Sequence, residues 1–370
     1  TSNISAKLGV KPLANHLFKI QYQRNWSWDV GVPGGDAFPG PAKATYTDIG
    51  RHLLSASYRI SNITEKWTAL ELKYFTQYIA REVMMEPNTV TQASLPNGNV
   101  QRTTPEVFYP TGYHLTNGVQ LQGIWDLSER NTLIAGVDVW GRKLRTGREK
   151  HIRIDILNPA GNIIKTNNVV RGETPIPESS FSSAGLFFQN ETRLMDNRLT
   201  MILGGRFDGI RIKNQEGYDV DYIIMNGERN DNPPTQRITF EKGTEYNLSW
   251  SANAGFLYKL SGNTDLSLNL ARAFRAPSLE ERFKYIDLGN FVRLGDPTLK
   301  PEKSYSADLG IRVWKSKFNL QAGIFINHLN NMIVETPGEF VFRLTADSKA
   351  DTIPALVNAN VRKALLYGVD

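Results

Sequence analysis

The chain has 370 residues, a formal net charge of +6 at neutral pH and no cysteine, so disulfide bonds and thiol chemistry are excluded. Its mean hydropathy is −0.37, and no run approaches the 18 apolar residues of a membrane-spanning helix. These values do not exclude a transmembrane β-barrel, because half of each barrel strand faces a polar lumen and the hydropathy signal is weak. The length suits two or three soluble domains or one large barrel.

Apolar and polar residues alternate in many segments, whereas no helical period of useful length occurs. The segment Asp265–Leu270 is an example, because its three leucines fall on one strand face and its polar residues on the other. We expect the leucines to point out of a barrel and the polar residues to point into it. In chain order, the pattern predicts 13 strands, near residues 2–11, 14–25, 52–61, 67–80, 115–127, 131–142, 182–194, 198–212, 244–260, 264–274, 303–314, 318–330 and 363–370.

The connections between these strands alternate in length. Short polar turns are expected near residues 12–13, 61–66, 128–130, 195–197, 261–263 and 315–317. Long loops are expected over residues 26–51, 81–114, 143–181, 213–243, 275–302 and 331–362. Long structureless loops are uncommon in compact soluble domains, but short periplasmic turns opposite long extracellular loops are typical of transmembrane barrels. Aromatic residues near strand ends are expected to form interfacial girdles: Trp26, Trp28, Trp67, Trp125, Trp140 and Trp314.

Two motifs enclose the loop 275–302. The first is Phe274-Arg275-Ala276-Pro277, where Pro277 lacks an N–H and so ends ladder pairing. The second is Gly295-Asp296-Pro297-Thr298-Leu299-Lys300-Pro301, where Pro297 and Pro301 stiffen the return to the next strand. The ordered pair resembles motifs of TonB-dependent outer-membrane receptors. Residues 183–191, 196–208, 330–333 and 364–370 are also similar to segments of that family, so the resemblance covers roughly residues 115–370.

The resemblance implies an all-β protein, an antiparallel section of a 22-stranded barrel that imports iron chelates, haem or cobalamin. Thirteen strands are too few for that barrel, and no plug domain or TonB box is found. We therefore expect residues 1–370 to be part of the barrel domain of a longer, multi-pass receptor in the outer membrane of a Gram-negative bacterium. The implied partners are outer-membrane lipid, lipopolysaccharide, a small metal chelate and the TonB complex, which would act through the absent plug. No nucleic acid, cofactor or enzymatic activity is expected.

The cargo is expected to be an iron–siderophore or haem, with cobalamin or an oligosaccharide as alternatives. Arg275 could reach an anionic ligand, or the two motifs could only fasten the loop between strands. The stretch Arg142–Arg153 could attract anions or be a solvated face. Its candidate ligand-binding residues are Arg142, Arg145, Arg148, Lys150 and His151, and Lys143 and Arg153 belong to the same stretch, with only Glu149 opposed. No histidine lies within residues 278–294, which counts against haem, and no metal-site spacing occurs.

Two other classes of protein are alternatives to this interpretation. An outer-membrane hydrolase barrel would need a Ser/His or Asp/His constellation at the loop ends. His114 and His328 are placed for one, but no partner motif supports it. An extracellular β-rich adhesin would not explain the ordered pair of motifs.

Overall fold

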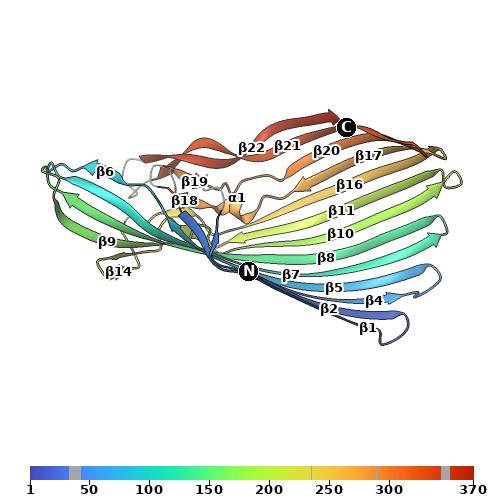
Figure 1. The fold of residues 1–370 in the computed structure, drawn as a ribbon, viewed down its shortest axis with the longest axis horizontal. Coiled ribbons are helices and arrows are strands. Elements are labelled where there is room, and N and C mark those ends of the chain that lie inside the picture. The colour runs from blue at the N-terminus through green and yellow to red at the C-terminus, as the bar shows by residue number, and fades with distance from the viewer. Residues whose placement is uncertain (33–42, 235, 289–290, 343–350) are drawn as a thin grey trace.

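In the computed structural model, residues 1–32, 43–234, 236–288, 291–342 and 351–370 are described. Thirteen long strands account for most of this part of the chain, as the alternating pattern predicts (Figure 1). They are β1 (Ser2–Val10), β2 (His16–Ser27), β4 (Lys43–Ser61), β5 (Trp67–Glu86), β7 (Val100–Ser128), β8 (Asn131–Leu157), β10 (Ser179–Leu194), β11 (Leu199–Asn214), β16 (Gly243–Ser261), β17 (Thr264–Arg275), β20 (Glu302–Lys315), β21 (Phe318–Phe342) and β22 (Asp351–Val369).

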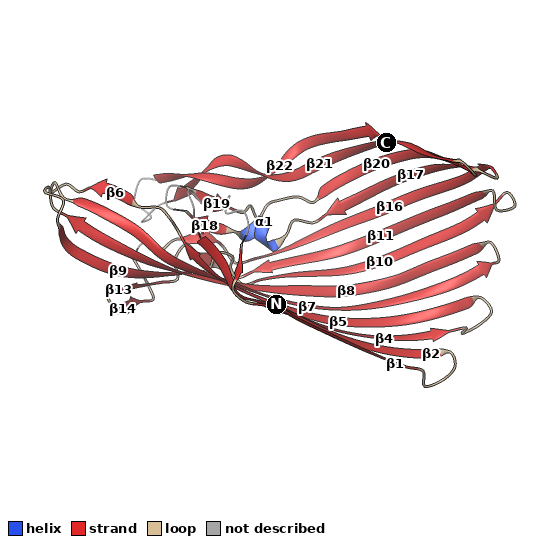
Figure 2. Cartoon of the chain, in the orientation of Figure 1, coloured by secondary structure: helices blue, strands red, loops and turns tan. Residues whose placement is uncertain are grey.

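Each long strand pairs antiparallel with the next long strand in chain order, so the wall is a single meander. Figures 1 and 2 show a strongly curved sheet with β1 and β22 at opposite edges. No pairing joins these two strands within the described ranges, and the sheet is open. No helix among the described residues is long and apolar enough to cross a membrane.

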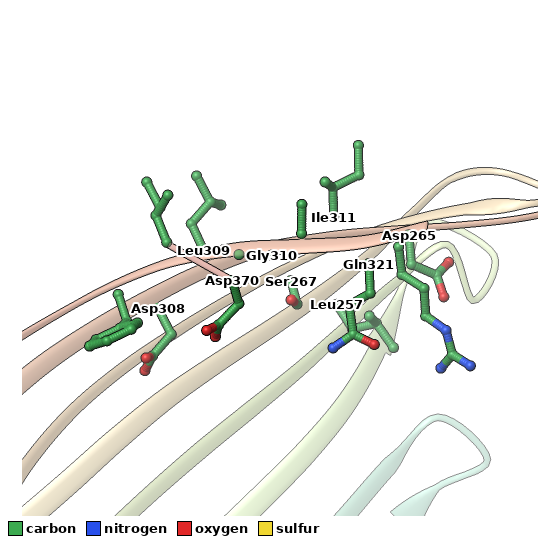
Figure 3. A pocket seen from close by; sticks show the side chains of 14 residues that line it. Leu257, Asp265, Ser267, Asp308, Leu309, Gly310, Ile311, Gln321 and Asp370 are labelled. Atoms are coloured by element: carbon green, nitrogen blue, oxygen red, sulfur yellow. The ribbon is translucent and has the colours of Figure 1, made fainter. Parts of the chain in front are cut away.

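The two faces of the wall differ in polarity. Leu309 and Ile311 point away from the concave side, whereas Asp308 and Asp265 point into it (Figure 3). The leucines of the segment Asp265–Leu270 are paired across the ladder with Ile311, Leu309 and Ala307, so they share the outer face. The expected orientation of this segment is therefore confirmed. Alternation makes an apolar outer face and a polar inner face, which suits a strand between lipid and an aqueous lumen.

The turns occur where short turns are expected, but several long loops are much shorter than predicted. Residues 143–157 continue β8, and β21 and β22 extend into the segment 331–362. Beyond the apolar belt the residues are mostly polar, but their side chains still alternate between the two faces. The neighbouring strands accept and donate the backbone hydrogen bonds there, so the ladder continues. The 11-residue β9 (Ile163–Glu173) pairs with β8 and β13 and does not join the meander. The remaining strands are short: β3 (Val30–Gly31), β6 (Thr91–Ser94), β12 (Gly217–Tyr218), β13 (Tyr222–Met225), β14 (Glu228–Asn230), β15 (Ile238–Phe240), β18 (Tyr285–Asp287) and β19 (Val292–Leu294).

The loop segments pack against the inner face of the wall at its long-loop end. The one helix of the described residues, α1 (Leu279–Phe283), lies with β18 and β19 inside the curve of the sheet (Figure 2). Their apolar residues join inward-facing wall residues in a buried cluster that includes Leu144, Phe181, Ile212, Leu279, Phe283 and Val292. In addition, β19 pairs parallel with β22. We call this long-loop end of the wall the mouth. Its described residues therefore form a packed layer rather than a set of free loops.

Three tryptophans show where the aromatic prediction holds and where it fails. Trp67 and Trp125 stack with ring centroids 5.9 Å apart beside a short turn, at the position expected of an interfacial girdle. Trp140 instead stacks on Phe181 in the inward-facing cluster, with centroids 5.1 Å apart. The expectation that Trp140 faces the interface is wrong, because strand alternation places it on the same face as Asp138 and Arg142.

Candidate functional site

The two sequence motifs meet at Arg275. This residue ends β17 and lies opposite Glu302, the first residue of β20. The Arg275 Nε donates to Glu302 at 2.6 Å, and its Nη1 and Nη2 donate to the two carboxylate oxygens of Glu281 at 2.8 and 2.9 Å. Such forked pairs between arginine and carboxylate are strong and directional. The guanidinium is therefore held on both edges by carboxylates of the protein itself, and contact with a ligand stays a prediction.

Glu281 also fixes the start of α1. Ser278 accepts a hydrogen bond from the Glu281 N–H at 3.1 Å, and Glu281 accepts one from the Ser278 N–H at 2.8 Å, which completes a capping box. Pro277 directly precedes this cap, so β17 cannot continue its ladder there. One carboxylate thus joins the end of the wall strand to the first turn of the loop.

The buried Arg282 connects α1 to the second motif. Its side chain is 0% exposed, and its Nη1 donates to Glu245 at 2.5 Å and to the carbonyl of Pro297. Its Nη2 donates to the carbonyl of Leu299 at 2.7 Å. Gly295 passes so close to this helix that a Cβ there would lie 2.5 Å from the Arg282 carbonyl carbon. The motif needs glycine at this position because of that close approach.

The second motif is also tied to the wall. The Asn360 side chain accepts from the Lys300 N–H at 2.8 Å and donates to the Lys300 and Asn331 carbonyls at 3.0 and 2.7 Å. The Asn358 amide donates to the Glu281 carbonyl at 2.8 Å. The two motifs, the family-like segment 330–333 and the β22 residues Asn358 and Asn360 are thus one hydrogen-bonded unit. Its geometry is that of a fastening that holds the loop over the inner face of the wall.

A cavity of about 600 Å³ lies beneath this fastening, on the inner face of the wall. Trp140 and Phe181 form a stacked aromatic pair on its lining, and Phe274 and Pro277 line the same space. Arg142 lines the same space and donates to Glu280 at 3.0 Å. Aromatic planes beside guanidinium groups can hold a flat, anionic molecule by stacking and charge-assisted hydrogen bonds. We call this space the aromatic hollow.

A charged group borders the aromatic hollow on the wall side. The Arg206 Nε donates to both carboxylate oxygens of Asp208, at 2.9 and 2.8 Å, and its Nη1 donates to Asp138 at 2.6 Å. Sequence spacing indicates the Arg206–Asp208 neighbourhood, but Asp138 comes from another strand. The hollow as a whole was missed by sequence reasoning, because its members are brought together only by cross-strand register.

The basic stretch is not a free loop, and that expectation is wrong. Its residues lie on β8, where alternation divides them between the two faces. Arg142, Arg148 and Lys150 point inward, as do the buried Leu144 and the Arg148 partner Glu173. The other members of the stretch, Lys143, Arg145, His151 and Arg153, occupy the alternate positions on the outer face.

The inward-facing cations are neutralised by acids from distant segments. Arg148 donates to Glu173, and the Lys150 Nζ lies 3.0 Å from Glu173 and donates to the Asp287 carbonyl at 2.9 Å. Arg171 adds a third cation, 2.9 Å from Glu173. This group lies beyond the apolar belt, where burial and then the charge of Arg148 lower the pKa of Lys150 to about 8, opposed by Glu173.

Two outward members of the stretch are also paired. Arg145 lies 3.2 Å from Glu178, and Arg153 lies 3.3 Å from Glu106. His151 lies 3.7 Å from Glu149. The sequence shows Glu149 as the only opposing acid, but the fold supplies five more: Glu106, Asp155, Glu173, Glu178 and Glu280. Ligand binding by these residues stays a prediction. The prediction assumed an excess of unpaired positive charge, and the ion pairs remove most of that excess.

The two candidate histidines of a hydrolase lie on opposite faces. His114 is paired with the inward-facing Leu144, whereas His328 is paired with the exposed Tyr305. They cannot act on one substrate across the wall. Among the described residues, no group of three His, Cys, Asp or Glu side chains is arranged to hold a metal ion.

The family model of the TonB dependent receptor-like β-barrel matches residues 9–370. The chain belongs to this family. Members of the TonB-dependent receptor family are outer-membrane β-barrels of Gram-negative bacteria and are transport receptors rather than enzymes. The family resemblance found in the sequence is thereby confirmed.

Solved TonB-dependent receptors share the fold of this chain. The copper transporter OprC superposes with a TM-score of 0.65 at 16% identity, covering 99% of this chain and 49% of that protein. The ferric-catecholate import receptor Fiu from Escherichia coli K12 gives a TM-score of 0.54 at 12% identity, covering 99% and 54%. At these identities the likeness concerns the fold alone.

A partial sequence similarity also links the chain to Transferrin-binding protein A of Neisseria meningitidis serogroup B. Two such proteins are 39% identical over 92 residues and 32% identical over 129 residues. These alignments cover 25% and 35% of this chain but only 10% and 13% of those proteins. This TonB-dependent receptor therefore spans a small part of the curated relatives that it matches, and about half of the solved structures.

Proposed function

We propose that the chain is a wall section of an outer-membrane receptor that imports an iron chelate, with an iron–siderophore bearing aromatic, anionic groups as the cargo. The aromatic hollow carries this proposal. Trp140 and Phe181 offer a stacking surface, and Arg142 lies on the same inner face beside the loop base. A metal catecholate combines flat rings with negative charge, so both features of the hollow would contribute to its binding.

Haem is less well suited to this hollow. It is flat and anionic, but its iron usually takes an axial protein ligand such as histidine. None of the described residues that line the hollow is a histidine. The siderophore is therefore the preferred cargo, and haem, cobalamin and oligosaccharide remain alternatives to be tested.

The transport step would depend on parts outside this chain. An open sheet edge in lipid leaves backbone N–H and C=O groups without partners, which is unfavourable by several kcal/mol for each group. We infer that the edges of β1 and β22 are paired by further strands of the same receptor. A plug domain within that larger barrel would contact TonB and receive its energy, while the wall residues position the cargo without covalent chemistry.

A second candidate cargo is iron carried by a host protein, which follows from the partial similarity to Transferrin-binding protein A. The extension formed by β8, β9, β13 and β14 beyond the wall would be the contact surface for such a carrier. Loss of the gene separates these cargoes. We expect the deletion strain to fail on a ferric catecholate as sole iron source and to grow on haem and on iron-loaded transferrin.

Substitutions in the full-length receptor test the hollow itself. We expect Trp140→Leu combined with Arg142→Gln to weaken ferric-catecholate binding at least tenfold, measured by calorimetry. The matched control is Trp314→Leu combined with Arg312→Gln, which changes the same residue types, two positions apart, near a short turn. Unchanged affinity in the first variant would exclude the hollow as the binding site.

A further inference from the structure

Two lysines of different strands lie in one cross-strand row on the inner face of the wall. Lys19 of β2 is paired with Ser57 of β4, and Ser57 is paired in turn with Lys73 of β5. The row continues through Gln120 of β7 to the inward-facing Asp138 of β8, so both lysines point into the lumen. Neighbouring strands are about 4.8 Å apart, so the Cα atoms of the two lysines are about 10 Å apart.

A third lysine completes a basic cavity at this place. Lys7 of β1 is two residues from Gly9, which is the cross-strand partner of Lys19. Lys7, Lys19 and Lys73 together line a cavity of about 250 Å³. The other inward-facing side chains that line it can offer hydrogen bonds or an aromatic surface: Gln21, Ser55, Ser57 and Phe75. We call this cavity the lysine pocket.

The lysine pocket carries positive charge without matching acids. Lys73 lies 3.3 Å from Glu71, and that carboxylate is shared with Arg59 at 4.0 Å. Lys7 and Lys19 form no ion pair or hydrogen bond through their side chains within the described ranges. The inward-facing arginines of the mouth each lie against a carboxylate instead. The free positive charge of the inner face is therefore in the lysine pocket rather than at the mouth.

Phe75 connects the lysine pocket to the aromatic hollow. A Cβ added to Gly118 of β7 would lie 2.5 Å from the Phe75 ring and 2.9 Å from the Trp140 Cβ, so glycine leaves the room that this ring occupies. Phe75 and Trp140 are thus neighbours across Gly118, and Trp140 stacks on Phe181. Aromatic side chains of β5, β8 and β10 form a strip along the inner face. A flat aromatic group can be stacked at each point of such a strip.

The lysine pocket is closer to the short turns than the aromatic hollow is. Lys19 lies three residues beyond the first residue of β2, and Lys7 lies three residues before the last residue of β1. Trp140 lies nine residues beyond the first residue of β8. The turns that join β1 to β2 and β7 to β8 are at the same end of the wall (Figure 1). The difference of six residues corresponds to about 20 Å along a strand.

We propose that the lysine pocket is a second binding site for the anionic chelate, which occupies it after leaving the aromatic hollow and before release on the short-turn side. This inference rests on the proposed function. Catecholate oxygens accept charge-assisted hydrogen bonds from ammonium groups, and Phe75 offers a surface for the attached ring. The cavity is smaller than the site of a drug-sized ligand, so it takes one catecholate arm of the chelate. Neutralised cations at the mouth and free ones near the short turns favour inward movement of an anion.

The test compares surface binding with uptake in cells that carry the full-length receptor, with the iron(III) complex of 2,3-dihydroxybenzoate as the probe. We expect the triple variant Lys7→Gln, Lys19→Gln and Lys73→Gln to bind the probe within twofold of the unmodified affinity in de-energised cells, because the hollow is intact. Its uptake of radioactive iron from the probe in energised cells should be at least fivefold slower. The variant with arginine at the same three positions should take up iron within twofold of the unmodified rate, because the charge is kept.

The matched control is Lys11→Gln, Lys66→Gln and Lys317→Gln, which removes three charges at the short turns and should leave uptake unchanged. Equal uptake by the two glutamine variants overturns the proposal, and so does slow uptake by the arginine variant, which would indicate a structural role. Entry of a large antibiotic into de-energised cells of the first variant also overturns it, because a plug carboxylate would then be the occupant of the pocket. Failure of the unmodified receptor to bind the probe would contradict the proposed function instead.

Discussion

Replacing Arg282 by methionine should release the second motif from α1. The substitution keeps most of the side-chain volume but removes the donors to Glu245 and to the carbonyls of Pro297 and Leu299. Breaking a buried charged pair is unfavourable by about 3–5 kcal/mol. The Glu245 side chain is 40% exposed, so water can solvate its carboxylate and the lower value applies. A loss of about 3 kcal/mol would raise the equilibrium constant for local opening of the second motif about 100-fold in Arg282→Met.

Hydrogen exchange of the full-length receptor measures this opening. The amide of Gly295 donates to the Lys284 carbonyl at 2.6 Å, and the amide of Asp296 donates to the Glu281 carbonyl at 3.1 Å. Both amides should exchange about 100-fold faster in Arg282→Met. Lys300→Met is the matched control, because Lys300 is exposed in the same loop and its side chain holds no partner among the described residues. A change of less than threefold in Arg282→Met would refute the fastening role.

Three further outcomes are expected. Gly295→Ala should lower the yield of folded receptor by forcing the backbone of α1 to shift, whereas Gly262→Ala, whose Cβ would meet nothing within 4 Å, should not; equal yields would contradict the close approach. Because the pKa of Lys150 is lowered to about 8, its amine should be acylated with a midpoint near pH 8, and a midpoint near 10.5 in competitive labelling would disprove the buried setting. The same shift makes stability depend on pH, because between pH 8 and 10.5 the unfolded chain holds a proton on Lys150 that the folded protein does not hold. The stability that is present above pH 10.5 is therefore lost as the pH falls through 8. The denaturation midpoint should rise between pH 8 and 10.5 in the wild type and be flat in Lys150→Met.

The wall of the barrel could be predicted from the sequence because its signal is local. Each strand carries its own alternation of apolar and polar residues, and each short turn interrupts it. The segment Asp265–Leu270 shows both properties, and the structure places its leucines outside. Motif resemblance then identified the family, which composition alone could not do.

The mouth could not be predicted in the same way, because its contacts are distant in sequence. Arg148 and Lys150 look like members of a solvated charged loop until Glu173 and Asp287 are placed beside them. Trp140 and Phe181 are separated by 41 positions and meet only through cross-strand register. Polar strands beyond the membrane also lack the apolar face by which sequence reasoning finds a strand.

The pairing of the inward cations with carboxylates lowers the electrostatic potential that a charged cargo would meet on approaching the mouth. A cation held against a carboxylate acts at a distance as a dipole, and the potential of a dipole decays more steeply than that of a single charge. Arg148 and Arg275 thus exert little pull on a molecule several ångströms away, although each contributes a strong local field. We expect a negatively charged cargo to arrive at an unsteered rate, about 10⁵–10⁶ M⁻¹s⁻¹, with little dependence on salt. Discrimination between cargoes would then take place on contact, through shape and hydrogen-bond geometry, after diffusion has already delivered them.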